Sequence, residues 1–155
     1  MRQARAGLDR IVVVALVNRA GQVLLRSRDQ VSAVRANRWS LPGGGAQPGE
    51  SPQQAAARLV REQTGLDFTE PLREVFHGRL TEPAADVQLF ATGLDVTTAE
   101  LPFDPVPGAN PRFRGYLLEF VDGPEVLSGR AFTPVSGYVL PRFLSSRHYR
   151  ELAGG

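Results

Sequence analysis

Residues 41–66 read LPGGGAQPGESPQQAAARLVREQTGL, and this stretch carries the strongest structural signal in the chain. The pattern predicts a helix over about 51–64. A serine that can cap the helix stands at its start, Pro52 suits the first helical position, and Gln54 completes a capping-box-like pair. Gly65 follows at a position where a left-handed backbone commonly ends a helix. The sequence therefore predicts a glycine-rich loop that leads into a helix with well-marked ends.

The segments on both sides of this helix have the composition of strands. Residues 11–17 are continuously apolar and rich in β-branched side chains, and residues 22–26 follow after a turn, so the two predict a hairpin. Further strands are expected at 73–79, 87–93 and 116–121, with a shorter one near 137–140. A short terminal helix is expected after Pro141. Strands on both sides of a strongly marked helix predict an α/β fold, in which helices cover a mixed sheet.

The spacing in residues 44–66 resembles the Nudix box, G-x5-E-x7-R-E-U-x-E-E-x-G-U, in which U is a bulky aliphatic residue. Five residues separate Gly44 from Glu50, and seven separate Glu50 from Arg58. Seven of the nine defined positions match in register. Besides the three residues just named, the matching residues are Val60, Glu62, Gly65 and Leu66. The resemblance implies a Nudix-type α/β/α sandwich with a mixed β-sheet, formed by residues 1–155 as a single domain.

The resemblance also implies a divalent-metal site. In the family, glutamates at positions 59, 62 and 63 bind Mg²⁺ or Mn²⁺, and the backbone carbonyl at the position of Gly43 adds a ligand. Magnesium prefers hard oxygen ligands and combines one or two carboxylates with substrate phosphates. The metal neutralises the diphosphate and helps to activate the attacking water. The implied activity is the hydrolysis of a nucleoside diphosphate linked to another group, and the family is often dimeric.

This chain departs from the box at two of the three glutamate positions. Leu59 cannot bind a metal ion, and Gln63 offers only a neutral amide oxygen as a ligand. Glu62 is the remaining glutamate, and it is either a catalytic metal ligand or a solvated residue beside an arginine. Because losing a general base costs about 10²–10⁴-fold in rate, two readings stay open. The first is a weakened hydrolase that depends on a divalent metal; the second is an inactive nucleotide-binding module of the same fold.

Other residues are candidates to hold or complete the site. Glu50 and Arg58 are expected to form an ion pair that ties the loop to the helix, while Gly44 and Gly65 are expected to have structural roles. Glu119 lies within an apolar strand, where an unpaired charge is costly. It is therefore the first candidate for a replacement catalytic group.

The charged residues are unevenly placed. All 18 basic residues are arginines, eight of them lie within residues 1–40, and the net charge is only +2. Three arginines are candidates to bind the phosphates of a nucleotide-type ligand, namely Arg26, Arg28 and Arg38. The alternative is a solvated basic surface. No arginine cluster is interleaved with aromatic residues, so nucleic acid is not favoured as a partner.

The composition gives no sign of a membrane or secreted protein. No apolar run approaches the roughly 20 residues that cross a bilayer. Cysteine is absent, which leaves neither a disulfide framework nor a thiolate metal site. We therefore expect a cytoplasmic protein with no membrane partner.

Overall fold

The structure is a computed structural model that describes residues 9–28, 38–66, 71–82, 84–101 and 116–154. The strands are β2 (Asp9–Asn18), β3 (Gln22–Arg28), β4 (Arg38–Ser40), β5 (Gly43–Gly45), β6 (Arg73–Thr81), β7 (Ala84–Leu94), β8 (Tyr116–Asp122) and β9 (Ala131–Phe132). The helices are α1 (Pro52–Thr64), the 3-10 turn η1 (Thr98–Glu100), α2 (Gly123–Val126), α3 (Pro134–Leu144) and α4 (Arg147–Leu152).

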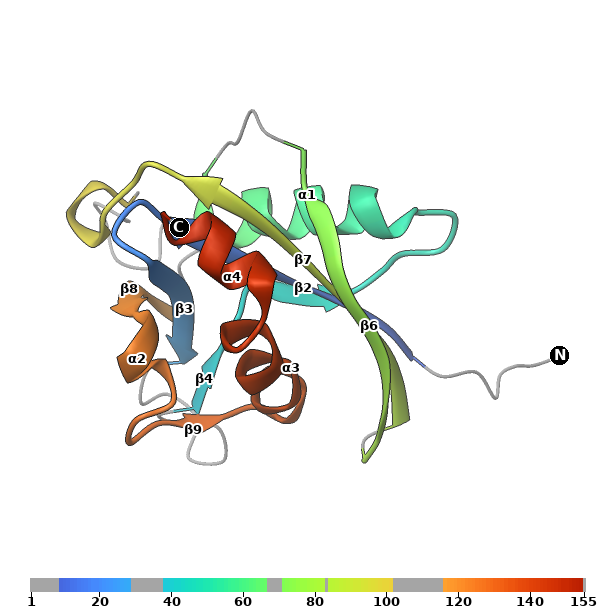
Figure 1. Cartoon of the computed structure of the whole chain (residues 1–155). Helices are drawn as coiled ribbons and strands as arrows, with labels where there is room; N and C mark the ends of the chain where they lie inside the picture. The colour runs from blue at the N-terminus through green and yellow to red at the C-terminus, as the bar shows by residue number, and fades with distance from the viewer. Residues whose placement is uncertain (1–8, 29–37, 67–70, 83, 102–115, 155) are drawn as a thin grey trace, which may run out of the picture.

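These strands form one mixed sheet of eight strands with the order β6-β7-β2-β3-β4-β9, in which β5 also pairs with β2 and β8 with β3 (Figure 1). The central strand β2 runs parallel to β7 over its whole length and antiparallel to β3 and β5. This arrangement confirms the expected mixed sheet. The predicted strands at 11–17, 22–26, 73–79, 87–93 and 116–121 all fall inside observed strands.

The sheet splits next to its centre. Strands β2 and β3 are in register only at Val17 and Val23, beside the turn that joins them. Further along, β2 pairs with β5, where Val13 faces Gly43, whereas β3 pairs with β4, where Arg26 faces Ser40. Strands β2 and β3 therefore diverge beyond the turn. Strand β5 of the glycine-rich loop lies along β2 on one side of this split, and β4 lies along β3 on the other.

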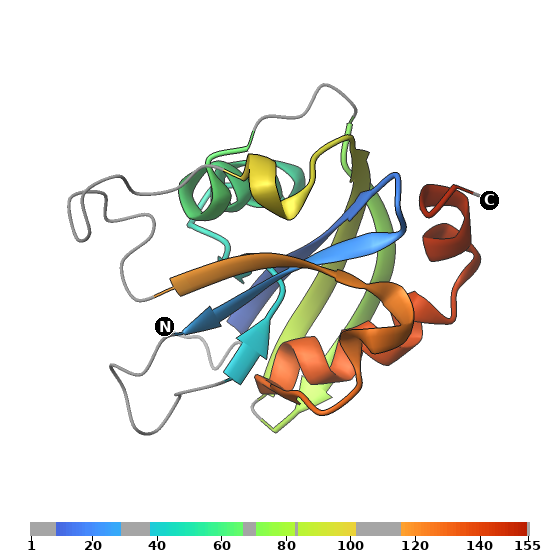
Figure 2. The same cartoon turned by 90° about the vertical axis from the view of Figure 1, so that its left-hand side faces the viewer.

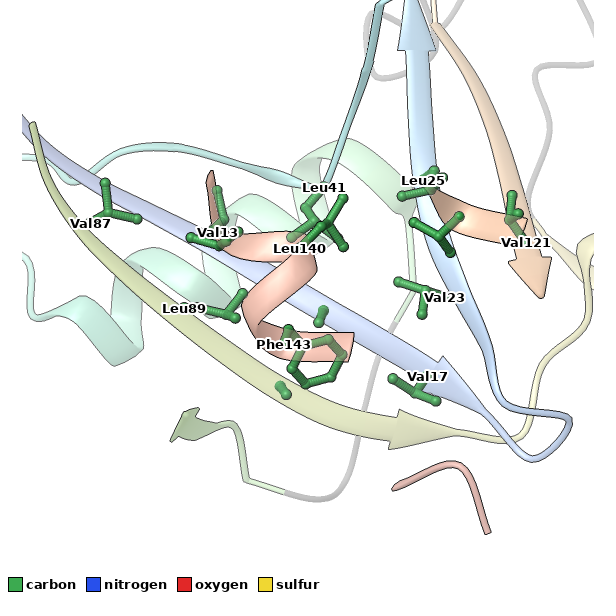
Figure 3. Packing of buried hydrophobic residues seen from close by; sticks show 14 of the residues in the cluster. Val13, Val17, Val23, Leu25, Leu41, Val87, Leu89, Val121, Leu140 and Phe143 are labelled. Atoms are coloured by element: carbon green, nitrogen blue, oxygen red, sulfur yellow. The ribbon is translucent and has the colours of Figure 1, made fainter. Parts of the chain in front are cut away.

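Helices cover both faces of the sheet, with α1 on one face and α3 and α4 on the other (Figure 2). Alternate residues of β2 point to opposite faces, and because both faces are covered the strand reads as continuously apolar. Val12, Val14 and Leu16 pack with α1, while Val13, Ala15 and Val17 pack with α3. Figure 3 shows this second cluster, in which Leu140 and Phe143 of α3 lie against the sheet. The expected α/β/α sandwich is thus confirmed.

The ends of α1 agree with the prediction. Ser51 is the N-cap, and its side chain and that of Gln54 form the reciprocal capping box. Gly65 ends the helix with φ of 73°, a left-handed conformation that favours glycine. Both signals are local in the sequence, so the surrounding fold does not change them.

One element was predicted wrongly. Residues 137–140 were expected to form a strand, but they lie in the middle of α3. The buried residues of this helix are Ser136, Val139, Leu140 and Phe143, spaced as one face of a helix. Packing of that face against the sheet outweighs the β preference of the short segment. The helix also runs through Pro141, and a separate helix, α4, follows it.

Candidate functional site

Arg58 of α1 connects the helix to the loop that precedes it. Its Nε donates to Oε2 of Glu50 at 2.8 Å and its Nη2 to Oε1 of the same carboxylate at 3.0 Å, a two-point contact. The guanidinium also donates to the carbonyl of Gly45 at 3.1 Å and to Glu62 at 3.2 Å. The ion pair expected between Glu50 and Arg58 is therefore present, and it fixes the position of the loop relative to the helix.

Glu50 is held almost entirely in its ionised form. The hydrogen bonds from Arg58, together with one from the backbone N–H of Gln47 at 2.9 Å, lower the pKa of Glu50 from 4.5 to about 2. The same pair raises the pKa of Arg58. The carboxylate has 13 % of its side chain exposed, which keeps the pair partly shielded from water.

This pair predicts how stability depends on pH. Because the folded protein lowers the pKa of Glu50 to about 2, the pair stabilises the fold above pH 4.5 and loses that effect as the pH falls towards 2. We expect Glu50→Gln to be less stable than the native protein at pH 7 and to approach it at pH 3 in urea unfolding. Glu125→Gln, which removes a carboxylate that is exposed, is the control. A constant difference between native protein and Glu50→Gln from pH 7 to 3 would contradict the assignment.

Gln63 of α1 bonds to the glycine-rich loop in both directions. Its Nε2 donates to the carbonyl of Gly43 at 2.9 Å, and its Oε1 accepts from the N–H of Gly43 at 2.9 Å. The same Oε1 accepts from Nη1 of Arg26 on β3 at 2.8 Å. We refer to Arg26, Gly43 and Gln63 as the Gln63 cluster. It joins α1, β3 and β5 through side-chain and backbone hydrogen bonds.

The other two glutamate positions of the box face different surroundings. Leu59 is 5 % exposed and packs in the core beneath α1, where its Cδ2 lies beside Gly44. Glu62 has 59 % of its side chain exposed and pairs with Arg58. Position 59 is thus a core position, and position 62 lies at the surface.

The donor set does not fit a magnesium cluster. Magnesium needs several oxygen ligands in near-octahedral geometry, yet both the Gly43 carbonyl and Oε1 of Gln63 already accept hydrogen bonds. Within the described residues, no group of three or more His, Cys, Asp or Glu side chains is placed to hold a metal ion. A metal role for Glu62, Gly43 and Gln63 therefore stays a prediction that the hydrogen bonding does not favour.

A cavity of about 280 Å³ lies where the sheet splits, beside the Gln63 cluster. Two arginines line it: Arg26, which is 7 % exposed, and Arg38, which is exposed. The hydroxyl groups in the wall belong to Ser40, Thr133 and Ser136, and the loop backbone is that of Gly43 and Gly44. The apolar side chains are Ile11, Val13, Leu41 and Val135. Arg26 and Arg38 thus bring two guanidinium groups to the wall of the cavity.

The remaining candidates lie elsewhere. Glu119 of β8 is exposed and pairs in register with Leu25, whose side chain packs on the α3 face. Because directly opposed residues share a face of the sheet, Glu119 lies on the opposite face from α1, and the structure does not bring it together with Glu62. Its catalytic role stays a prediction. The side chain of Arg28 lies outside the described part of the chain.

Sequence reasoning missed the contribution of the C-terminal region to the cavity. Strand β9 pairs with β4, which brings Thr133 and Ser136 to the cavity wall. Ser136 is buried, and its Oγ accepts from the N–H of Leu41 at 2.9 Å. A serine on the apolar face of α3 is the signal that points to such a bond, but it becomes visible only once the segment is known to be a helix.

The fold and the loop–helix geometry define the class as a Nudix-type α/β/α sandwich. A family model described as the NUDIX domain matches residues 7–134, and the chain therefore belongs to the Nudix family. Nudix hydrolases generally act on nucleotide pyrophosphate bonds with divalent metals such as Mg²⁺. Among the described residues, no helix is long and apolar enough to cross a membrane.

Curated relatives match over part of the chain. The CTP pyrophosphohydrolase of Escherichia coli K12 is 40% identical over 58 residues, which is 37% of this chain and 42% of that protein. The RNA pyrophosphohydrolase of Azorhizobium caulinodans is 40% identical over 68 residues, or 41% of this chain and 39% of that protein. The chain thus matches less than half the length of these relatives.

Solved structures match over most of the chain. A MutT protein from Methanosarcina mazei Go1 superposes with a TM-score of 0.63 at 22% identity, covering 88% of this chain and 92% of the other. The solution structure of the E. coli ORF135 protein gives a TM-score of 0.61 at 24% identity, covering 96% and 98%. At these identities the likeness establishes the fold.

Proposed function

We propose that this protein binds a nucleotide-type phosphorylated ligand in the cavity at the sheet split and has little or no metal-dependent hydrolase activity. One observation carries the proposal: Gln63 bonds to both the N–H and the carbonyl of Gly43. In the family these two positions contribute to the metal site, and here they are joined to each other. With Leu59 buried in the core, Glu62 is the one carboxylate that remains at the three glutamate positions of the box.

The lining of the cavity supports the class of ligand. Arginine pairs well with phosphate because its planar guanidinium offers several donors to the phosphate oxygens. Arg26 and Arg38 supply such groups, while hydroxyl and apolar side chains supply the rest of the wall. The volume of about 280 Å³ is close to the lower end, about 300 Å³, of small-molecule sites. A ligand with a phosphate group and a modest apolar part fits this surface.

A second candidate is a weak hydrolase that uses Glu62. The exposed carboxylate of Glu62 and the loop–helix held by Glu50 and Arg58 favour it, as do the pyrophosphohydrolase activities that the names of the relatives state. In this candidate Glu62 binds Mg²⁺ or Mn²⁺ and takes part in catalysis. It requires Glu62 to leave Arg58 and the Gln63 cluster to open.

One screen separates the two candidates. The purified protein is incubated with nucleoside triphosphates, nucleotide sugars, dinucleoside polyphosphates and ADP-ribose, with Mg²⁺ or Mn²⁺, and scored for turnover and for thermal stabilisation. We expect at least one ligand to raise the melting temperature by a few degrees, about 1–3 kcal/mol of binding linkage, without turnover. Metal-dependent turnover that Glu62→Gln abolishes, but the exposed control Glu125→Gln keeps, would establish the hydrolase instead.

Three further expectations belong to the same proposal. Residues 1–155 are taken as one domain, because both core clusters share the same sheet. We propose a cytoplasmic location, with which the cysteine-free composition agrees. A homodimer follows from the resemblance to the family and is checked by light scattering of the purified chain.

A further inference from the structure

Arg26 holds a position in the Gln63 cluster that ties it to the helix of the box. It lies two residues after Leu24 on β3, so its side chain points to the α1 face of the sheet, where Leu24 packs. Its Nη1 reaches Gln63 at 2.8 Å, and the residue also lines the cavity. A guanidinium remains charged at every physiological pH. The positive charge of Arg26 therefore lies between α1 and the cavity.

The chemistry of the cluster requires an amide at position 63. Oxygen Oε1 receives two donors, the N–H of Gly43 and Nη1 of Arg26, whereas the Gly43 carbonyl needs a donor that only Nε2 supplies. If the amide were flipped, Nε2 would face two donors, the N–H of Gly43 and Nη1 of Arg26, and Oε1 would face the Gly43 carbonyl. The orientation of Gln63 is therefore determined by its partners. A glutamate at this position would face the Gly43 carbonyl with a second acceptor. Gln63 is thus matched to a cluster that contains a cation.

A divalent ion at this position would lie close to that cation. Magnesium binds its oxygen ligands at about 2.1 Å, so an ion on Oε1 of Gln63 would lie within about 5 Å of Nη1 of Arg26. Like charges at such a distance repel each other strongly in a partly buried site. We therefore expect that Arg26 in this position and a metal ion on Gln63 exclude each other.

We propose that Arg26 takes the place of the divalent cation of the family, so that this chain binds the phosphate groups of its ligand without Mg²⁺ or Mn²⁺. The inference rests on the proposed function, because it assumes that the cavity at the sheet split receives a phosphorylated ligand. Arg26, oriented by Gln63, supplies the positive charge at the inner wall, and Arg38 supplies it at the exposed part of the cavity. In this proposal the positive charge that faces the phosphate groups comes from arginine side chains of the protein and not from a bound metal ion.

Calorimetric titration of the full chain with inorganic pyrophosphate tests this inference directly. We expect dissociation constants in EDTA and in Mg²⁺ that agree within about threefold, a free-energy difference below about 1 kcal/mol. Arg26→Gln is expected to weaken binding by about 10- to 100-fold in both buffers, the effect of losing a charged hydrogen-bond donor. Arg38→Gln is expected to weaken it as well, and this exposed position keeps the test valid if Arg26→Gln does not fold. Arg79→Gln, an exposed charge change on β6 away from the cavity, should bind like the native protein.

Electron paramagnetic resonance of Mn²⁺ gives a second readout that needs no ligand. The native chain is expected to leave Mn²⁺ in solution. Pyrophosphate binding that requires Mg²⁺, or Mn²⁺ binding that Glu62→Gln removes, would overturn the inference and leave the proposed nucleotide site standing. No pyrophosphate binding in either buffer would overturn both.

Discussion

Replacement of Gly43 by alanine is expected to destabilise the fold by about 3 kcal/mol or more, the upper range for overpacking a closed site. A Cβ at this position would lie 2.5 Å from the carbonyl oxygen of Val12 and 2.9 Å from the Cα of Val13. Both atoms belong to the backbone of β2, which is paired along its whole length with β7. The clash therefore cannot be relieved by rotating a side chain, and moving β5 away would break the bonds between Gly43 and Gln63.

The neighbouring glycines provide a graded control. At Gly44 the nearest atom to a new Cβ is the Leu59 side-chain tip at 3.2 Å, which can move, and at Gly45 it is a backbone oxygen at 4.0 Å. We expect Gly45→Ala to stay within about 0.5 kcal/mol of the native protein, as surface changes do, and Gly44→Ala to fall between the two. Urea unfolding of the three variants measures the series. Equal stability of Gly43→Ala and Gly45→Ala would mean that β5 does not lie against β2 as described.

Replacement of Leu59 by glutamate, the residue that the box calls for, is expected to destabilise the fold by about 3–5 kcal/mol, as an unpaired buried charge does. Leu59 is 5 % exposed and packs beneath α1 with Val12 and Val60, both fully buried. Burial would raise the pKa of the new carboxyl group, so the loss should be smaller at pH 5 than at pH 8, where the group must ionise. Unfolding by urea at both pH values measures this difference.

Leu59→Met is the matched control, since a swap of similar volume costs less than about 1.5 kcal/mol. The double variant Leu59→Glu/Gln63→Glu restores the glutamates of the box. We expect it to be less stable than the native chain and to lack strong Mg²⁺-dependent turnover, because Arg26 would pair with the carboxylate at position 63. A variant with native stability and strong turnover would show instead that the native box is simply disabled and that position 59 tolerates a ligand.

These predictions follow from how the chain uses the loop and helix of its box. Glu50, Arg58 and Gly65 hold the loop and the helix through bonds that need no metal ion. Leu59 and Gln63, which stand at two glutamate positions, also act within the protein, one in the core and one across the sheet split. Internal contacts thus hold the architecture of the family. At position 63, where the box calls for a glutamate, the side chain of Gln63 donates a hydrogen bond to Gly43.

The sequence predicted those features whose causes lie within a few residues of each other. The capping box of Ser51 and Gln54 and the left-handed Gly65 define α1, and the continuous apolar run of β2 indicates a strand covered on both faces. The pairing of Glu50 with Arg58 also followed from the spacing of the box. The segment 137–140 was misjudged because four residues show no clear period, and the helical period of α3 becomes evident only over its whole length.

The sequence by itself determined the family, the loop–helix and the presence of Leu59 and Gln63 at two glutamate positions of the box, because each depends on local residue types and spacings. Only the tertiary structure decided what replaced those glutamates. Gln63 meets Gly43 across 20 residues and Arg26 across 37, and Glu119 is turned to the opposite face by the pleat of β8. The physical reason is that hydrogen bonds and burial act between neighbours in space. Sheet pairing brings such neighbours together from segments whose local sequences carry no sign of each other.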